Sequence, residues 1–245
     1  MSKDLFSGHA DLYASFRPTY PDDLFQFIFK HVRDFDKAWD CGTGNGQVAQ
    51  SIASHFKRVD ATDISKKQLD NAKPIENVVY RVCPAESTPF PNDCFDLICV
   101  GQAIHWFNWN EFYSECKRVA KGGCVIALFG YSPMRMSKPF DTLVDNFYDN
   151  VIYDYWETER KIVEDQYRSL PFPFELIESP GFKIERNLTI QGVEGYFNTW
   201  SSVQKFLRER GFNPVSQLMT EIKPLWKEQV QSVYFPVFSK IGRIL

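Results

Sequence analysis

The sequence predicts an α/β protein: a seven-stranded, mostly parallel sheet with helices on both faces and a helical cap from the C-terminal half. Three observations support this fold class. Short apolar runs alternate with helical patterns between residues 36 and 130. The run FDLICV is continuously apolar, as is typical of a central parallel strand. After residue 131 the pattern changes to long stretches with helical spacing and two further strand-like runs.

The expected elements follow in chain order. Strands are predicted at 37–41, 58–62, 78–82, 95–100, 124–129, 181–191 and 231–240. Helices are predicted at 22–32, 47–55, 65–71 and 110–120, with helical stretches at 137–168 and 195–229. Pro21 suits a helix start, Ser65 suits an N-cap, and the pair Gly122 and Gly123 is expected to close the helix before them. The segment CPAESTPFPND is too rich in proline for a helix.

We expect one domain with three parts. Residues 1–35 form a leader and a first helix over the ligand site, and 36–130 form the ligand-binding core. Residues 131–245 supply the helical cap, the substrate region and the last strands. A chain of 245 residues with 44% hydrophobic residues is long and apolar enough for such a core.

Composition excludes several classes of protein. The net charge of -3 and the pI of about 5.9 argue against a nucleic-acid partner. The six cysteines form no C-x-x-C pair and have no histidine cluster beside them, so neither a metal site nor a disulfide framework is expected. The start of the chain lacks a signal-peptide core, and no run approaches the roughly 20 apolar residues of a membrane span. These features predict a reduced, cytoplasmic protein without a membrane partner.

The glycine turn DCGTGNG, which follows the first strand, is ambiguous by itself. Gly44, Gly46 and Ala49 satisfy G-x-G-x-x-A, and Asp63 stands near the distance expected for a ribose-binding acid. That arrangement would fit a dinucleotide, or a turn that holds no ligand. Asp40 favours a different ligand, because a carboxylate directly before the turn would repel a pyrophosphate and attract a positive charge.

The motifs around this turn resemble those of class I S-adenosylmethionine-dependent methyltransferases of the type 11 group. DCGTGNG matches the first motif of that family, and VDATDIS matches its ribose-binding motif. CPAESTPFPNDCFDLICVGQAIHWF resembles the adenine loop and fourth strand, while RVAKGG lacks the proline usual in the family. HADLYASFRPTYP, AIHWF and GYFNTWSS are similar to a subset that includes trans-aconitate-type small-acid methyltransferases.

The resemblance implies S-adenosylmethionine as the cofactor. It implies that Ile64 packs on the adenine, that Ala85 and Glu86 lie beside it, and that Gln102 and Ala103 face the methionine moiety. The complete set of expected cofactor-binding residues is Tyr13, Arg17, Asp40, Gly42, Gly44, Asp63, Ile64, Ala85, Glu86 and Gln102.

Candidates for catalysis and acceptor binding lie outside the glycine motif. His105 follows the fourth strand and could act as a base, and Arg17 could pair with a carboxylate of the cofactor. The expected acceptor-pocket residues are Tyr20, Trp106, Tyr131, Arg135, Tyr196 and Trp200. Structural roles remain open for several of them: His105 could hydrogen-bond a loop, Arg135 could be solvated, and Trp200 could hold the fold together.

The function predicted from these residues is methylation of a small molecule, with a carboxylic acid oxygen as the acceptor. A carboxylate needs no general base, and the sequence offers no clear acid/base pair. The alternatives are a quinone-like or lipid-soluble acceptor, an NAD-type oxidoreductase, and a cofactor-binding module without catalysis. The protein is expected to be a monomer or a homodimer.

Overall fold

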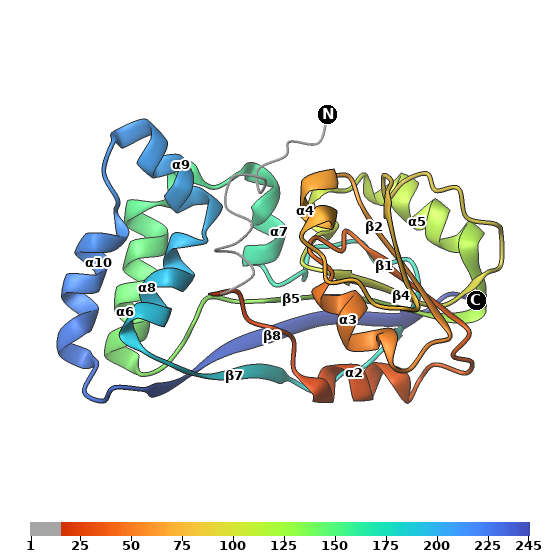
Figure 1. The fold of residues 1–245 in the computed structure, drawn as a ribbon, viewed down its shortest axis with the longest axis horizontal. Helices are drawn as coiled ribbons and strands as arrows, with labels where there is room; N and C mark the ends of the chain where they lie inside the picture. The colour runs from red at the N-terminus through yellow and green to blue at the C-terminus, as the bar shows by residue number, and fades with distance from the viewer. Residues whose placement is uncertain (1–15) are drawn as a thin grey trace.

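The computed structural model describes residues 16–245 and forms one sheet flanked by helices (Figure 1). The predicted Tyr13 contact lies outside the described residues. Eight strands hydrogen-bond in the order β3-β2-β1-β4-β5-β8-β6, and β7 also pairs with β8. The strands are β1 (Lys37–Cys41), β2 (Arg58–Asp63), β3 (Val78–Val82), β4 (Phe95–Gly101), β5 (Ala120–Tyr131), β6 (Glu175–Ile177), β7 (Phe182–Leu188) and β8 (Gln231–Arg243).

The order of the strands around β1 shows where in the sheet a ligand site is expected. β1 runs parallel to both β2 and β4, with Asp40 opposite Ala61 on one side and Cys99 on the other. β2, which follows β1 in the chain, therefore lies on one side of β1, and the later strand β4 lies on its other side. The carboxyl ends of parallel strands at such a switch point form a crevice. This confirms the predicted mostly parallel α/β sheet.

The structure adds one strand to the seven expected. β6 has only three residues, two of them exposed, and it pairs with the C-terminal part of β8. A segment this short carries no alternating pattern, so the sequence offers no signal for it. The strands β6, β7 and β8 complete the sheet by antiparallel pairing beyond β5.

Helices cover both faces of the sheet because alternate strand residues point to opposite sides. Ala38 packs in the core on the face of α2 (Asp22–Phe29) and α3 (Gln47–Ala53). Trp39 packs on the other face, against Phe112 of α5 (Trp109–Val119). The short helix α4 (Lys66–Asp70) begins with Ser65, whose hydroxyl accepts from the Gln68 N–H as the sequence predicts.

The predicted close of α5 is wrong in detail. The helix ends at Val119, and Gly122 and Gly123 lie within β5. Gly123 has a φ of +85°, and the pairing with β4 shifts register in this region. The glycine pair therefore forms an irregular strand start and no helix cap.

The cap consists of short helices where the sequence predicts long helical stretches. These elements are α6 (Lys138–Asn146), η2 (Phe147–Val151), η3 (Tyr153–Tyr155), η4 (Thr158–Arg160), α7 (Lys161–Glu164), α8 (Ile190–Asn198), α9 (Ser201–Arg210), α10 (Val215–Ile222) and η5 (Lys223–Leu225). Trp156 and Trp200 adopt extended backbone conformations between helices. Gly211 ends α9 with a φ of +78°. Tertiary packing of these aromatic residues overrides the continuous helical pattern.

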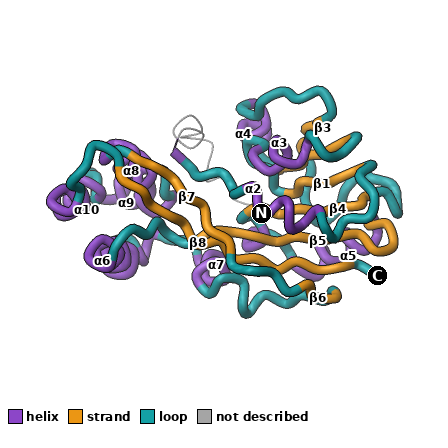
Figure 2. The backbone as a smooth tube through the Cα atoms, turned by 90° about the horizontal axis from the view of Figure 1, so that it is seen from below, coloured by secondary structure: helices purple, strands orange, loops and turns teal. Residues whose placement is uncertain are grey.

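The cap is joined to the core by two long strands. β7 and β8 run side by side from the cap helices into the main sheet (Figure 2). Buried residues of the cap and of the α2 face form one continuous hydrophobic cluster. Within residues 16–245, no helix has the length and apolar character needed to span a bilayer.

Candidate functional site

The glycine turn after β1 adopts a conformation that side chains disfavour. Gly42, Gly44 and Gly46 have φ values of +69°, +57° and +85°. A Cβ on Gly42 would lie 2.5 Å from the Ala103 Cβ, whereas one on Gly44 would meet no atom within 4 Å. The turn is thus packed against the end of β4 at Gly42 and open at Gly44.

Asp40 is the penultimate residue of β1, just before this turn, and is fully buried. Its Oδ2 accepts hydrogen bonds from the Thr43 hydroxyl and, at 2.8 Å, from the Ala49 N–H. Its Oδ1 has no hydrogen-bond partner among residues 16–245. Burial raises the pKa of Asp40 to about 7, against the lowering effect of both hydrogen bonds.

Asp63 ends β2 and connects that strand to the glycine turn. Its Oδ2 accepts from the Gly44 N–H at 2.9 Å, and its Oδ1 accepts from the Ser65 N–H at 2.8 Å. Ile64 follows it with 45% of its surface exposed. The two residues present a carboxylate and an apolar surface side by side at the same strand end.

These strand ends enclose a cavity of about 220 Å³. It brings together every predicted cofactor-binding residue among the described residues, namely Arg17, Asp40, Gly42, Gly44, Asp63, Ile64, Ala85, Glu86 and Gln102. Tyr20, Trp106 and Tyr131 of the predicted acceptor set also line it. The motifs, which are separated along the chain, therefore meet around one cavity.

Arg17 connects the leader to both the sheet and the cap. Its Nη1 donates to the Tyr131 hydroxyl at 3.1 Å, and its Nη2 donates to the Thr199 carbonyl at 3.1 Å. The residue is 9% exposed and lines the cavity. Tyr20 packs edge-on against Tyr131. The buried guanidinium adds one positive charge to a cavity wall that also carries the carboxyl groups of Asp40, Asp63 and Glu86.

Gln102 lines the cavity with a strained backbone, at a φ of +51°. Its side-chain carbonyl accepts from the Tyr131 N–H at 3.0 Å, and its N–H donates to the Phe129 carbonyl at 2.7 Å. Gln102 therefore joins the ends of β4 and β5. A non-glycine residue in this conformation is held by surrounding structure, as is common at functional sites.

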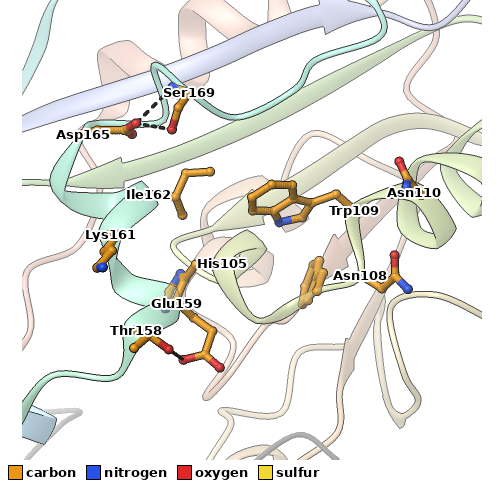
Figure 3. A pocket seen from close by; sticks show the side chains of 11 residues that line it. His105, Asn108, Trp109, Asn110, Thr158, Glu159, Lys161, Ile162, Asp165 and Ser169 are labelled. Atoms are coloured by element: carbon orange, nitrogen blue, oxygen red, sulfur yellow. Dashed lines mark hydrogen bonds between the residues drawn. The ribbon is translucent and has the colours of Figure 1, made fainter.

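His105 does not line this cavity. It lies in η1 (Ile104–Trp106) and borders a second cavity, of about 630 Å³, between the first turn of α5 and the cap segment 158–169 (Figure 3). Its Nδ1 is buried and meets no hydrogen-bond partner among the described residues, and burial lowers the pKa of His105 to about 3. The ring is neutral at physiological pH, and its neighbour Trp106 takes the position beside the first cavity.

Three predicted acceptor residues also lie outside the first cavity. Arg135 forms an ion pair with Asp145 at 2.6 Å in the connection to α6. Tyr196 and Trp200 are each 2% exposed and pack against each other in the cap core. Their aromatic rings pack in the core and do not form a pocket wall. The sequence pattern of isolated aromatic residues cannot distinguish these two roles.

The cavity also includes residues that sequence reasoning did not single out. Thr43, Gln68, Cys83 and Phe107 line it. Thr43 could have been found, because it occupies the variable position of the glycine motif and its hydroxyl faces Asp40. Phe107 ends the AIHWF segment and borders both cavities.

The arrangement suits a ligand with a positive group near the turn and a polar ring system near β2. An ammonium group would supply the partner that the buried Asp40 Oδ1 does not find in the described part of the chain. A pyrophosphate at the same place would face a buried carboxylate and be repelled. Among residues 16–245, no cluster of three His, Cys, Asp or Glu side chains could hold a metal ion.

Comparisons with known proteins agree with this geometry. A family model described as a methyltransferase domain matches residues 39–128. A Dictyostelium discoideum protein named as a methyltransferase is 30% identical over 249 residues, which cover 98% of this chain and 95% of that protein. A solved structure from Anaeromyxobacter dehalogenans, titled as a type II methyltransferase, has 36% identity and a TM-score of 0.88. It covers 94% of this chain, and the alignment includes 99% of that structure.

A more distant structure, from Bacillus halodurans, has 20% identity and a TM-score of 0.52, and it supports the fold alone. The closer matches exclude the NAD-type oxidoreductase among the alternatives, since they span nearly the whole chain. The chain belongs to the class I S-adenosylmethionine-dependent methyltransferases, and S-adenosylmethionine is its cofactor.

Proposed function

We propose that this enzyme methylates a carboxylate oxygen of a small molecule, and that Arg17 holds an anionic group in the cavity. The observation that carries the proposal is the buried guanidinium of Arg17 in the cavity wall. Arginine is suited to planar recognition of carboxylates. Hydrogen bonds to the Tyr131 hydroxyl and to the Thr199 carbonyl fix its orientation.

S-adenosylmethionine, when bound, supplies a methyl group already activated on a sulfonium. Asp40 would hold the α-ammonium through its Oδ1, and Asp63 would accept hydrogen bonds from the ribose hydroxyls. Ile64 offers its exposed side chain to the adenine. The open face of Gly44 lets the backbone approach the amino-acid part of the ligand.

The cavity also favours an acceptor that needs no general base. No histidine lines it within the described part of the chain, and His105 is neutral and borders the second cavity. Each carboxylate in the wall already accepts a hydrogen bond from a backbone N–H. Asp40 accepts from Ala49, Asp63 accepts from Gly44, and Glu86 accepts from Asn108 at 2.9 Å. A carboxylate nucleophile is ionised at neutral pH and needs only alignment with the methyl group and exclusion of water.

An acceptor screen tests the proposal. Purified protein and S-adenosylmethionine with a labelled methyl group are incubated with matched pairs of small acids and their amides, and with catechols and quinols. Carboxyl methyl esters release the label as methanol in mild base, whereas aryl methyl ethers do not. We expect base-labile product from the acids alone. Base-stable product from the phenolic compounds, with none from the acids, would assign a quinone-like acceptor and contradict the proposal.

The Asp63→Ala variant tests the cofactor end of the cavity. We expect S-adenosylhomocysteine to bind roughly ten- to hundredfold more weakly, because the ribose loses charge-assisted hydrogen bonds and the Gly44 N–H loses its acceptor. Calorimetric titration measures the affinity. Asp70→Ala is the control, since Asp70 pairs with Lys66 outside the cavity. Unchanged affinity in folded Asp63→Ala protein would remove Asp63 from the site.

The Arg17→Gln variant tests the acceptor end. We expect KM for acid acceptors to rise roughly tenfold or more, because a buried charge-assisted contact is lost. Titration with S-adenosylhomocysteine and with methylthioadenosine, which lacks the amino-acid part, shows whether Arg17 instead serves the cofactor carboxylate. Arg208→Gln, at an exposed position of α9, is the control. Wild-type kinetics and affinities in Arg17→Gln would return Arg17 to a structural role.

A further inference from the structure

Gln102 follows the last residue of β4 and connects this strand to the end of β5 through its side chain. The last paired residues of the two strands are Gly101 and Phe129. One residue further on, the Gln102 N–H donates to the Phe129 carbonyl at 2.7 Å. The Gln102 side-chain carbonyl accepts from the Tyr131 N–H at 3.0 Å. A side chain therefore extends the hydrogen-bond ladder between β4 and β5 into the cavity wall.

The left-handed backbone of Gln102 explains why a side chain takes this place. In a regular parallel ladder, the residue that donates to the Phe129 carbonyl also accepts the Tyr131 N–H through its own backbone carbonyl. At a φ of +51° the Gln102 backbone leaves the strand conformation, and its side-chain carbonyl accepts that N–H instead. This backbone conformation is unfavourable for a residue with a Cβ, so the surrounding structure must hold it.

The end of β5 is packed closely between Gln102 and β8. Gly130 pairs with Phe238 of β8, and a Cβ on Gly130 would lie 2.6 Å from the Phe238 ring and 3.4 Å from the Gln102 side-chain oxygen. The next residue, Tyr131, pairs with Val237. The position of Tyr131 therefore depends on β8 on one side and on the Gln102 side chain on the other.

The Tyr131 hydroxyl keeps a proton that it can donate to a ligand. It accepts from Arg17 Nη1 at 3.1 Å, and a hydroxyl that accepts from a guanidinium turns its own proton away from it. Within residues 16–245 the Tyr131 hydroxyl donates no hydrogen bond. Tyr20 and Phe235 pack edge-on against its ring, and both Tyr131 and Arg17 line the first cavity. The cavity wall thus presents a charged donor and a neutral donor side by side.

The strand order separates these donors from the carboxylates of the glycine turn. Asp40 and Asp63 lie at the carboxyl ends of β1 and β2, whereas Tyr131 ends β5, and β4 lies between β1 and β5. Neighbouring strands are about 4.8 Å apart, so the ends of β1 and β5 lie roughly 10 Å apart across the sheet. An anionic group bound beside Tyr131 is therefore remote from the buried carboxyl group of Asp40.

We propose that Gln102 is a positioning residue for the acceptor: it places the Tyr131 hydroxyl beside Arg17, and these two donors bind one oxygen of the acceptor carboxylate. The other carboxylate oxygen is left to attack the methyl group. This inference rests on the proposed carboxylate methylation and adds two residues to it. Tyr131 determines specificity through a directed hydrogen bond, and Gln102 acts through Tyr131.

The test is a double-mutant cycle on KM for a small monocarboxylic acid that the wild type methylates in the acceptor screen. Tyr131→Phe removes the hydroxyl, and Gln102→Met keeps the side-chain length but removes the acceptor oxygen. We expect each variant to raise KM for the acid about tenfold and to keep kcat and the affinity for S-adenosylhomocysteine within about threefold. Because Gln102 acts through the Tyr131 hydroxyl, the double variant should also raise KM about tenfold, and not about a hundredfold.

A second variant, Gln102→Asn, separates backbone strain from the hydrogen bond. Asparagine tolerates the left-handed conformation better than most residues, but its side chain is one methylene shorter and does not reach the Tyr131 N–H. It should raise KM for the acid about as much as Gln102→Met does, because both variants lose the same hydrogen bond. It also keeps the test decisive if Gln102→Met does not fold. Thermal unfolding of each variant shows whether the fold is retained.

Gln166→Met and Tyr155→Phe are the matched controls. Gln166 has a similar φ of +58°, its amide donates to the Ser132 hydroxyl, and it lines neither of the two cavities. The Tyr155 hydroxyl accepts from Arg210 at 2.6 Å, and Tyr155 also lines neither cavity. These variants remove the same chemical groups from similar surroundings and should leave KM for the acid unchanged.

The outcomes separate this inference from the proposed function. A rise in KM of about a hundredfold in the double variant would show that Gln102 and Tyr131 act independently, which overturns the positioning role. The role is equally wrong if Gln102→Met leaves KM for the acid unchanged and weakens only the binding of S-adenosylhomocysteine, because Gln102 then serves the cofactor. Carboxylate methylation stands in both cases. Methylation of no acid in the screen overturns the proposed function and this inference with it.

Discussion

The Asp40→Asn variant is expected to lose cofactor binding while gaining stability. Asn keeps an oxygen that can accept from the Thr43 hydroxyl and the Ala49 N–H, so the turn should fold as before. The substitution removes the negative charge that we propose to face the ligand ammonium. We expect S-adenosylhomocysteine to bind about a hundredfold more weakly at pH 8, because a charge-assisted contact in a buried site is removed.

The gain in stability follows from the pKa of Asp40. Burial raises the pKa of Asp40 to about 7 in the folded protein, from the ordinary value of 3.8 for this carboxyl group. A raised pKa contributes stability below the unfolded pKa, and that stability is lost as the pH rises through the folded value. Between pH 4 and about pH 7 the wild type should therefore lose about 4 kcal/mol relative to Asp40→Asn, which has no such charge to bury.

Chemical denaturation of both proteins at several pH values measures this difference. The free energies of unfolding should diverge up to about pH 7 and run parallel above it. Asp36→Asn is the control, since Asp36 is an exposed partner of Lys57 and Lys121 and lies outside the cavity. A constant difference between Asp40→Asn and the wild type across this range would show that Asp40 keeps an ordinary pKa.

The affinity of the wild type for S-adenosylhomocysteine should follow the same titration. Below pH 7 Asp40 is protonated in most molecules of the free enzyme. Binding of an ammonium group to Asp40 must then release this proton. The affinity should fall as the pH drops from 7 to 5, whereas that of Asp40→Asn should stay nearly flat. His105 should contribute no inflection near pH 6.5, since its pKa lies at about 3.

The Gly42→Ala variant is expected to be the most destabilising single substitution in the glycine turn. Its φ of +69° is unfavourable for alanine, and the new Cβ would lie 2.5 Å from that of Ala103, which cannot rotate away. Together these effects should lower the free energy of unfolding by roughly 2 to 4 kcal/mol. The displaced turn should also bind S-adenosylhomocysteine at least tenfold more weakly.

Gly44→Ala is the matched comparison. Gly44 has a similar φ of +57°, but a Cβ there meets no atom within 4 Å and lines the cavity. It should therefore lower stability by only about 1 to 2 kcal/mol, from backbone strain. Its main effect should be weaker ligand binding. Denaturation and titration of both variants provide the measurements, and equal stabilities would show that the contact between Gly42 and Ala103 relaxes without loss.

The sequence alone determined which residues gather around the glycine turn. Asp40 and Asp63 lie at the carboxyl ends of two strands that the apolar pattern predicts to within one residue, and parallel strands bring these ends to one edge of the sheet. Short-range sequence patterns are sufficient to predict this region, because the motif spacing, the positive φ values and the strand ends each depend on short segments of the chain. The five parallel strands and the helix with its Ser65 cap follow for the same reason.

Only the tertiary structure decided the acceptor end. An aromatic or basic side chain in the cap pattern is equally consistent with a pocket wall and with a packed core. Long-range packing buried Trp200 in the cap core, paired Arg135 with Asp145, and placed His105 beside the second cavity. These contacts join neighbours that are distant in sequence, so no local pattern encodes them.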